Sequence, residues 1–354
     1  WTEGRWFPVQ NVLTNYIDFV KMWGEQMANP FRFGVQISRF PSESATAKPD
    51  WKDYLCKLES LGYSTIFFPD HFGDQLEPLA AAAFSLAVTE RLNAGTLVLD
   101  VDYRHPVIAA KSAATTQILS GGRLEFGIGA GWMRSDYEQA GIPFDAPSVR
   151  IARLEEALQI TKAMWSQKTA SFKGVYYKIS EITGEASAFE RAGCSPPKIF
   201  IGGGGRKMLE LAGRHADIVG INPALPEGRV TAKTAADLTL ERAKAKVETV
   251  IESAEAAGRG MGELEFSCLV FVVSLLDDPS GLRSAIASTT GMSPKQVAEC
   301  PLFLTGPPSE IRERLQHLRE HTGISYIVIQ DGPQIPAGTV EKFSTEVVSQ
   351  LATS

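Results

Sequence analysis

Long apolar runs and cysteine motifs are both missing from this sequence. No stretch of about 18 apolar residues occurs, and no basic segment leads into an apolar block near the start. We therefore expect neither a membrane span nor a secretory signal, and we place the protein in the cytoplasm. The four cysteines form no C-x-x-C pair, which leaves a zinc knuckle or a disulfide framework without support. We expect buried thiols at Cys56, Cys194, Cys268 and Cys300.

An excess of basic residues is also absent. The chain has 35 Lys and Arg against 41 Asp and Glu, and it has no long Lys/Arg block, so it lacks the electrostatic footprint of a nucleic-acid binder. Neither H-E-x-x-H nor G-x-S-x-G occurs, which argues against zinc peptidases and serine hydrolases. With 44% apolar residues the chain can bury a large core, and we expect its partner to be a small molecule.

Short β-like runs alternate with helical stretches along the chain, and no Gly/Ser/Pro linker interrupts them. Eight runs are rich in Val, Ile and Phe, as doubly buried parallel strands are, and they cover residues 31–37, 65–69, 94–100, 124–129, 198–202, 217–221, 264–271 and 324–330. Two of the helical stretches follow Ser148 and Thr339, which we interpret as N-caps. Eight such units predict an α/β fold, a (β/α)₈ TIM barrel with insertions. An open doubly wound sheet is the alternative.

Three segments do not fit the repeating unit. Residues 169–197 contain a hairpin-like stretch, and residues 275–305 are rich in turn signals, so we interpret both as insertions that shape the mouth of the barrel. Residues 1–28 are an amphipathic extension of unknown role. Met27 is a plausible start, so we expect the residues before it to come from an over-long gene prediction. We predict a single barrel domain over residues 29–354.

Polar residues follow the predicted strands, where reacting groups gather in a barrel of this kind. Asp70 and His71 end an apolar strand, where a histidine can exchange a proton near neutral pH and Asp70 offers a fixed acceptor. The alternative is that Asp70 caps the next turn and His71 binds a loop carbonyl. Gln36, Asn222 and Gln330 follow other strands, and we predict substrate contacts for them because they should face the same mouth.

Four consecutive glycines, Gly202, Gly203, Gly204 and Gly205, end a predicted strand and open a helix. Their backbone N–H groups could approach a phosphate at the positive end of the helix, with charge added by Arg206 or Lys207. The run matches neither G-x-x-x-x-G-K-[ST] nor G-x-G-x-x-G, so kinase-type and Rossmann sites are excluded. A tight turn that needs positive φ is the alternative.

The other histidines are interpreted as structural. His317 and His321 are spaced i,i+4 in a charge-rich stretch, which is more typical of a solvated helix face than of a metal site. His105 precedes Pro106, a residue typical of the first helical turn. We predict no metal.

Four stretches carry a resemblance to a known family: GYSTIFFPDH at residues 62–71, RHPVIAAK at 104–111, GGRLEFGIGAGWM at 121–133 and IFIGGGG at 199–205. From about Phe31 to the C-terminus the chain resembles the bacterial luciferase-like flavin and deazaflavin oxidoreductases, most closely the actinobacterial subgroup dependent on coenzyme F420. The resemblance implies a TIM barrel, usually a homodimer. It also implies that F420 or FMN is bound with its ring at the carboxyl-terminal face of the barrel.

The resemblance implies roles for single residues. Asp70 is expected to touch the deazaflavin and His71 to transfer protons. Leu97 and Val98 match a pair that forms a non-prolyl cis peptide behind the ring, and Asp100 falls where relatives carry a hydroxyl. Further cofactor contacts are implied for Gly131, Trp132, Ser135, Gly202, Gly203, Gly204, Gly205 and Arg206.

Two of these positions differ from the glucose-6-phosphate dehydrogenase branch of the family. Trp132 and Ser135 fall where that branch carries Glu and Asn. The loss of the Glu, together with Asn222 at a place that contacts sugar phosphate, argues against that activity.

We therefore predict an F420-dependent oxidoreductase in which a hydride passes between C5 of the deazaflavin and a small organic molecule or peptide natural product. His71 is the expected proton donor or acceptor, with Asp70 beside it. The direction of the reaction stays open. The alternatives are an FMN-dependent monooxygenase on the same barrel and a non-catalytic flavin-binding barrel.

Overall fold

The strands of this computed structural model form a closed parallel barrel. The structure describes residues 29–37, 50–225, 232–235, 237–332 and 335–351. The eight barrel strands are β1 (Arg32–Ile37), β2 (Thr65–Phe68), β3 (Asn93–Thr96), β5 (Leu124–Gly129), β8 (Lys198–Gly203), β9 (Ile218–Ile221), β10 (Glu265–Val270) and β13 (Ile324–Asp331). Each pairs with the next in chain order, β13 pairs with β1, and β3 pairs with β5. The predicted barrel is confirmed, and the open-sheet alternative is wrong because the strands have no free edge.

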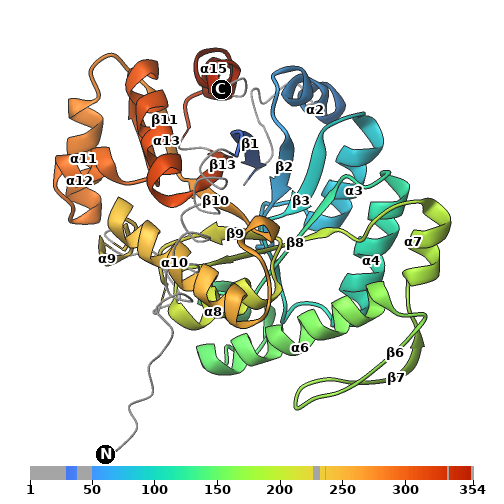
Figure 1. The fold of residues 1–354 in the computed structure, drawn as a ribbon. Coiled ribbons are helices and arrows are strands. Elements are labelled where there is room, and N and C mark those ends of the chain that lie inside the picture. Colours follow the sequence, from blue (N-terminus) through green and yellow to red (C-terminus); the bar gives the residue numbers. More distant parts are fainter. Residues whose placement is uncertain (1–28, 38–49, 226–231, 236, 333–334, 352–354) are drawn as a thin grey trace, which may run out of the picture.

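Helices surround this ring, as Figure 1 shows. The longer ones are α2 (Trp51–Ser60), α3 (Pro78–Val88), α4 (Pro106–Leu119), α6 (Pro147–Ser166), α8 (Arg206–His215), α10 (Leu240–Ala256), α11 (Ser280–Thr290) and α13 (Pro308–Thr322). The shorter ones are α5 (Arg134–Ala140), α7 (Ala186–Ala192), α9 (Ala232–Ala235), η1 (Met261–Glu263), α12 (Pro294–Glu299), α14 (Thr339–Phe343), η2 (Ser344–Val348) and α15 (Ser349–Leu351). None of the described helices has both the length and the apolar character needed to cross a bilayer.

The barrel interior is packed with large side chains at its centre. Phe67, Phe200 and Tyr326 point inward from three different strands, and the rings of Phe67 and Phe200 meet edge to face with centroids 5.7 Å apart. Below them, at the amino-terminal end, Arg32 forms ion pairs with Glu125 and Glu265. Burial of strands on both faces explains why the barrel strands are mostly apolar, with their charged residues near the strand ends. In barrels of this kind the reacting groups gather at the carboxyl-terminal ends of the strands.

Two segments outside the barrel have structure of their own. β6 (Thr169–Lys173) and β7 (Lys178–Thr183) form an antiparallel hairpin beside α6. The carboxylate of Glu156 on α6 accepts hydrogen bonds from three backbone N–H groups in the turn of this hairpin. β11 (Val272–Leu275) and β12 (Phe303–Gly306) form a separate parallel pair, with α11 and α12 between them in the chain. The sequence analysis found turn signals here and missed these elements. The extension over residues 1–28 lies outside the described residues, and the single-domain boundary stays a prediction.

Several local predictions need correction. α6 begins at Pro147 after Ala146, so Ser148 is not its N-cap, because the fixed φ of proline suits the first helical turn. The N-cap of α14 is Gly338 rather than Thr339. The run 94–100 is divided into β3 and β4 (Leu99–Asp100).

Two of the four thiols depart from the expectation. Cys268 and Cys300 are buried, whereas Cys56 on α2 and Cys194 after α7 are only half-buried. Both half-buried thiols lie in the outer layer, outside the closed barrel. His105, interpreted as structural, is the N-cap of α4 and accepts the N–H of Val107.

We predict that Gly127→Ala lowers the free energy of unfolding by about 1–3 kcal/mol or more. A Cβ at Gly127 would lie 1.8 Å from the carbonyl oxygen of Thr96, a backbone atom that cannot move aside without disturbing β3. Urea denaturation followed by circular dichroism measures the loss. Gly281→Ala on α11 is the matched control, because its Cβ meets nothing within 4 Å and alanine favours a helix. Equal stability of both variants would contradict the close packing at Gly127.

Candidate active site

Asp70 connects the end of β2 to β4 at the carboxyl-terminal end of the barrel. Its carboxylate follows β2 and accepts the backbone N–H of Asp100 at 2.9 Å. The same carboxylate accepts two N–H groups from Arg104, in the loop before α4. Although burial acts against it, the hydrogen bonds and charge of Asp70 raise the pKa of the Arg104 guanidinium. Asp70 thus accepts hydrogen bonds from Asp100 on β4 and from Arg104 in the loop before α4, and it does not cap the turn that follows it.

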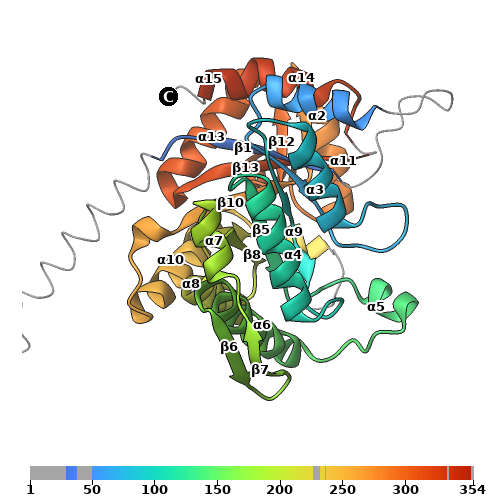
Figure 2. The same cartoon turned by 90° about the vertical axis from the view of Figure 1, so that its right-hand side faces the viewer.

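His71 contacts a carboxylate that the sequence analysis missed. Its Nδ1 lies 2.7 Å from Oδ2 of Asp136, which α5 supplies and which is only 4% exposed. Because an ionised carboxylate only accepts, this hydrogen bond requires the proton of the ring to be on Nδ1. The indole of Trp132 meets the imidazole edge to face, with centroids 5.6 Å apart. No sequence signal pairs residues 71 and 136, because they come from different βα units. The helix α5, which carries Asp136, lies at the right-hand edge of the view in Figure 2.

Asp100 lies at the end of β4 in a nearly dry environment. Its Oδ1 accepts the hydroxyl of Tyr137 and the N–H of Asp102, both at 2.9 Å. Burial raises the pKa of Asp100 to about 7; the hydrogen bonds from Asp102 and Tyr137 oppose that rise, and the charges of Asp102 and Asp70 add to it. Gly131 has φ +69°, and a Cβ there would lie 2.2 Å from Oδ2 of Asp100, so this position admits only glycine.

The peptide bond between Leu97 and Val98 is cis, as the resemblance implies. Gln36 holds this bulge, since its Nε2 donates to the carbonyl of Leu97 at 2.8 Å. Its Oε1 in turn accepts Nε2 of Gln330 at 3.1 Å. Gln36 and Gln330, two of the three predicted substrate contacts, therefore lie at the same end of the barrel. However, Gln36 is only 3% exposed, and its amide binds the backbone.

A lysine of α10 binds the glycine turn between β8 and α8. Nζ of Lys246 donates to the carbonyl of Gly204 at 3.0 Å, to that of Asn222 at 2.9 Å and to Oδ2 of Asp237 at 2.7 Å. Burial lowers the pKa of Lys246, and its bond to Asp237 opposes that change. The sequence analysis missed this lysine, because nothing in the sequence places α10 behind the turn. The backbone geometry of the turn thus depends on one buried ammonium group.

The front of the turn has room for a ligand. A Cβ at Gly205 would meet nothing within 4 Å, whereas one at Gly203 would meet Met208 and one at Gly204 would meet the backbone of Pro223. α8 begins at Arg206, and its N-cap Gly205 has no side chain to cap the first N–H groups. Beside the turn, Oδ1 of Asn222 is buried and has no hydrogen-bond partner among the described residues.

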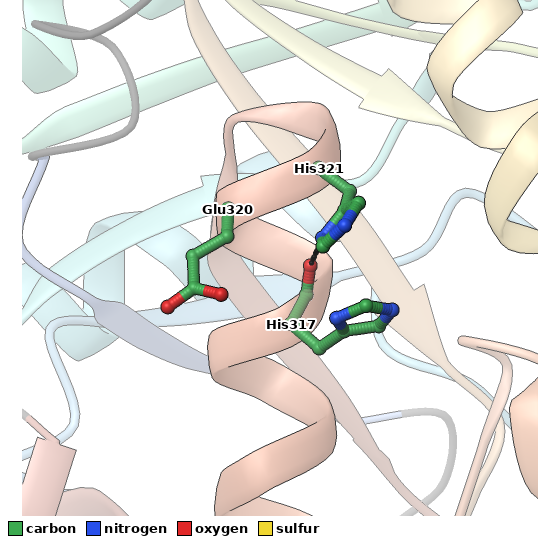
Figure 3. A group of neighbouring side chains, drawn as sticks. All are labelled: His317, Glu320 and His321. Carbon is green, nitrogen blue, oxygen red and sulfur yellow. Dashed lines mark hydrogen bonds between the residues drawn. The ribbon is translucent and has the colours of Figure 1, made fainter.

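The side chains of the remaining predicted residues do not reach over the glycine turn. The guanidinium of Arg206 is exposed and bonds Glu210 one turn along α8 at 2.8 Å, so it extends along the helix instead of over the glycines. Ser135 is exposed on α5. His317, Glu320 and His321 form an exposed group on α13, where Nδ1 of His321 donates to the carbonyl of His317 (Figure 3). The exposure agrees with the charge pattern, but the candidate ligand atoms lie within 4.8 Å of one another, and the absence of a metal here stays a prediction.

A closed parallel barrel with polar residues at the carboxyl ends of its strands is the arrangement of TIM-barrel enzymes. The profile of the luciferase-like monooxygenases matches residues 31–297, and the chain belongs to this family. Two solved structures share the fold: the coenzyme F420-dependent tetrahydromethanopterin reductase of Methanopyrus kandleri (TM-score 0.68, 18% identity, covering 91% of this chain and 100% of that one) and a long-chain alkane monooxygenase (TM-score 0.70, 16% identity, 92% of each).

Curated relatives use two different cofactors. An F420-dependent glucose-6-phosphate dehydrogenase of Beutenbergia cavernae is 26% identical over 329 residues, 86% of this chain and 94% of that protein. One from Intrasporangium calvum is 29% identical over 175 residues, 47% of this chain and 51% of that protein. An FMNH2-dependent dimethylsulfone monooxygenase of Pseudomonas putida is 30% identical over 206 residues, 54% of this chain and 56% of that protein. The chain thus spans about half the length of the last two relatives.

We predict that Asp100→Asn becomes more stable relative to the wild type as the pH rises. The folded pKa of about 7 exceeds the unfolded value of about 3.9, so folding binds a proton and the wild type loses stability as pH rises between them. Asparagine keeps the acceptor for Tyr137 without a charge. The difference between the two free energies of unfolding should grow by at most about 1.4 kcal/mol per pH unit. Urea titrations between about pH 5 and pH 7 test this, and a constant difference would contradict it.

Proposed function

We propose that this protein is an F420-dependent oxidoreductase that acts on a small organic molecule or a peptide natural product. The observation that carries the proposal is the position of Asp70 and His71 at the same barrel end as the cis bulge of Leu97 and Val98 and the glycine turn. A relative that matches over 94% of its length to this chain is named F420-dependent, which supports the same cofactor. The homodimeric state and the cytoplasmic location stay predictions.

The residues present fit such a cofactor. A phosphate needs N–H donors at a positive helix end, and α8 offers an uncapped first turn behind the open side of Gly205. A planar ring needs a surface to lie on and polar groups at its edge. The half-buried side chains of Leu97 and Val98 offer the surface, and the unpartnered Oδ1 of Asn222 offers an acceptor.

Reduced F420, when bound, supplies a hydride from C5. The chain's own task is then to move one proton, hold the substrate and keep water out. His71 would carry that proton at Nε2, since Nδ1 is engaged with Asp136. Asp70 is already bound to Arg104 and to the backbone of Asp100, so it serves as a fixed negative charge beside His71. Trp132 contributes an apolar wall against the imidazole.

Glucose 6-phosphate is not the substrate we propose. Trp132 would present an indole where the dehydrogenase branch of the family has a carboxylate, and Arg206, the charged residue next to the glycine turn, is engaged with Glu210. A sugar phosphate needs charged and polar partners, whereas an aromatic wall favours an unsaturated or aromatic substrate. A screen of hydride acceptors with the reduced cofactor tests the substrate class, with glucose 6-phosphate and oxidised F420 as the comparison.

We predict that the purified protein binds F420 at micromolar concentration and binds FMN much more weakly. Side-by-side titrations with both cofactors, oxidised and reduced, are read by quenching of tryptophan fluorescence, because Trp132 adjoins the proposed ring site. Tight FMN binding with no F420 binding would overturn the proposal. It would favour the second candidate, an FMN-dependent monooxygenase, which the Pseudomonas relative supports and which oxygen consumption would test. Binding of neither cofactor would favour a non-catalytic barrel.

We also predict that His71→Asn lowers turnover by roughly 10²-fold or more while leaving F420 affinity within a small factor of the wild type. The amide cannot exchange a proton, but it can occupy the space beside Trp132. Stopped-flow absorbance of the deazaflavin gives the rate, and the titration above gives the affinity. Unchanged turnover would exclude His71 as the proton donor or acceptor.

A further inference from the structure

α5 brings a buried carboxylate against the imidazole of His71. Asp136 is 4% exposed, and His71 is its hydrogen-bond partner among the described residues, at 2.7 Å. A buried carboxylate is costly to desolvate unless it is paired and hydrogen-bonded. The other ring nitrogen of His71, Nε2, makes no hydrogen bond to any described residue. One nitrogen of the ring is therefore fixed and the other is left for a reacting group.

The helix that carries Asp136 is itself fixed to the site. Tyr137, the next residue, is fully buried, and its hydroxyl lies 2.9 Å from oxygens of both Asp100 and Asp102. Arg150 of α6 donates to the carbonyl of Gly131 at 2.7 Å, in the segment that leads into α5. These bonds determine where Asp136 lies relative to His71. The ring of Tyr137 also packs against Tyr103 and Phe144, with centroids 5.4 and 4.9 Å apart, and such contacts matter because a helix of this length is marginal alone.

We propose that Asp136 is a positioning residue for the proton transfer at His71, holding the ring in the tautomer that has its proton on Nδ1. The proposal rests on the proposed function, and it applies to both directions of the reaction. In reduction, the ring starts as the imidazolium with a proton on each nitrogen; Nε2 gives its proton to the substrate atom next to the one that receives the hydride, and the neutral ring keeps the Nδ1 proton. In oxidation, the lone pair of Nε2 takes the proton that leaves the substrate as the hydride departs. Both directions need Nδ1–H bound to Asp136.

The first test uses the apoprotein and needs neither cofactor nor substrate. Histidine labelled with ¹⁵N distinguishes the two neutral tautomers by NMR, and His71→Asn assigns the His71 signals among the five histidines. We expect the wild type to show the Nδ1–H tautomer. In Asp136→Asn the amide can donate to Nδ1, so the Nε2–H tautomer should become populated. Glu138→Gln, which removes an exposed carboxylate from the same helix, is the matched control and should leave the tautomer unchanged.

The second test measures turnover with F420 and the substrate found in the screen. We expect Asp136→Asn to lower kcat at least about tenfold with little change in KM or F420 affinity, since the wrong tautomer impairs the chemical step. Glu138→Gln should keep wild-type rates. A wild type with the proton on Nε2, or an Asp136→Asn variant with unchanged tautomer and unchanged kcat, would overturn the role of Asp136.

Failure of the proposed function would look different. If F420 does not bind while the ¹⁵N spectra still show the Nδ1–H tautomer in the wild type and its loss in Asp136→Asn, the pairing stands and the cofactor assignment falls. If Asp136→Asn simply unfolds, Tyr137→Phe is the second variant. It keeps the buried ring, removes the bonds to Asp100 and Asp102, and should shift the same tautomer signals by loosening α5. Unchanged signals in a folded Tyr137→Phe protein would contradict the dependence on α5.

Discussion

Pairing of β3 with β5 closes the barrel, and the position of every polar group at its carboxyl-terminal end depends on this closure. The two strands meet at Ala94 with Leu124 and at Gly95 with Glu125. The approach is so close that glycines stand at Gly95 and Gly127, where a Cβ would overlap backbone oxygens. β4 pairs with the carboxyl-terminal end of β5. The two residues between β3 and β4, Leu97 and Val98, form the cis bulge, and Gln36 donates a hydrogen bond to the carbonyl of Leu97. Closure and the bulge are therefore parts of one packing arrangement.

Three buried carboxylates sit around that bulge, and each is stabilised in a different way. Asp70 has the guanidinium of Arg104, Asp136 has the imidazole of His71, and Asp100 has only neutral donors. Burial therefore raises the pKa of Asp100 to about 7. The three neighbouring carboxylates thus differ in their partners: a guanidinium for Asp70, an imidazole for Asp136 and neutral donors for Asp100.

The family relationship and the site give different kinds of information. The match over residues 31–297 and the solved structures establish the barrel and the family, in which both F420 and FMN enzymes occur. Fold alone does not select a cofactor or a substrate. The choice of cofactor and substrate depends on side chains such as Trp132, Asn222 and Lys246, and no sequence motif specifies the contacts of these side chains.

Much of the barrel was readable from the sequence. Apolar runs of five to eight residues are typical of strands buried on both faces, and eight of them separated by helices predict a closed barrel. Asp70, His71 and the glycines from Gly202 could also be placed, because the residues after parallel strands lie at one end of a barrel. The insertions were harder to interpret, since the pairing of β11 with β12 joins segments about thirty residues apart through strands of only four residues.

The sequence by itself therefore determined the class of fold and the end of the barrel where chemistry occurs, because both follow from local periodicity. Only the tertiary structure decided which groups act together. Asp136 reaches His71, Lys246 reaches Gly204 and Gln36 reaches Leu97 across distances of about forty to sixty-five residues along the chain. Arg206, adjacent to the glycines in sequence, extends instead toward Glu210. Such pairings depend on how separate βα units pack, and no local pattern of residues encodes that packing.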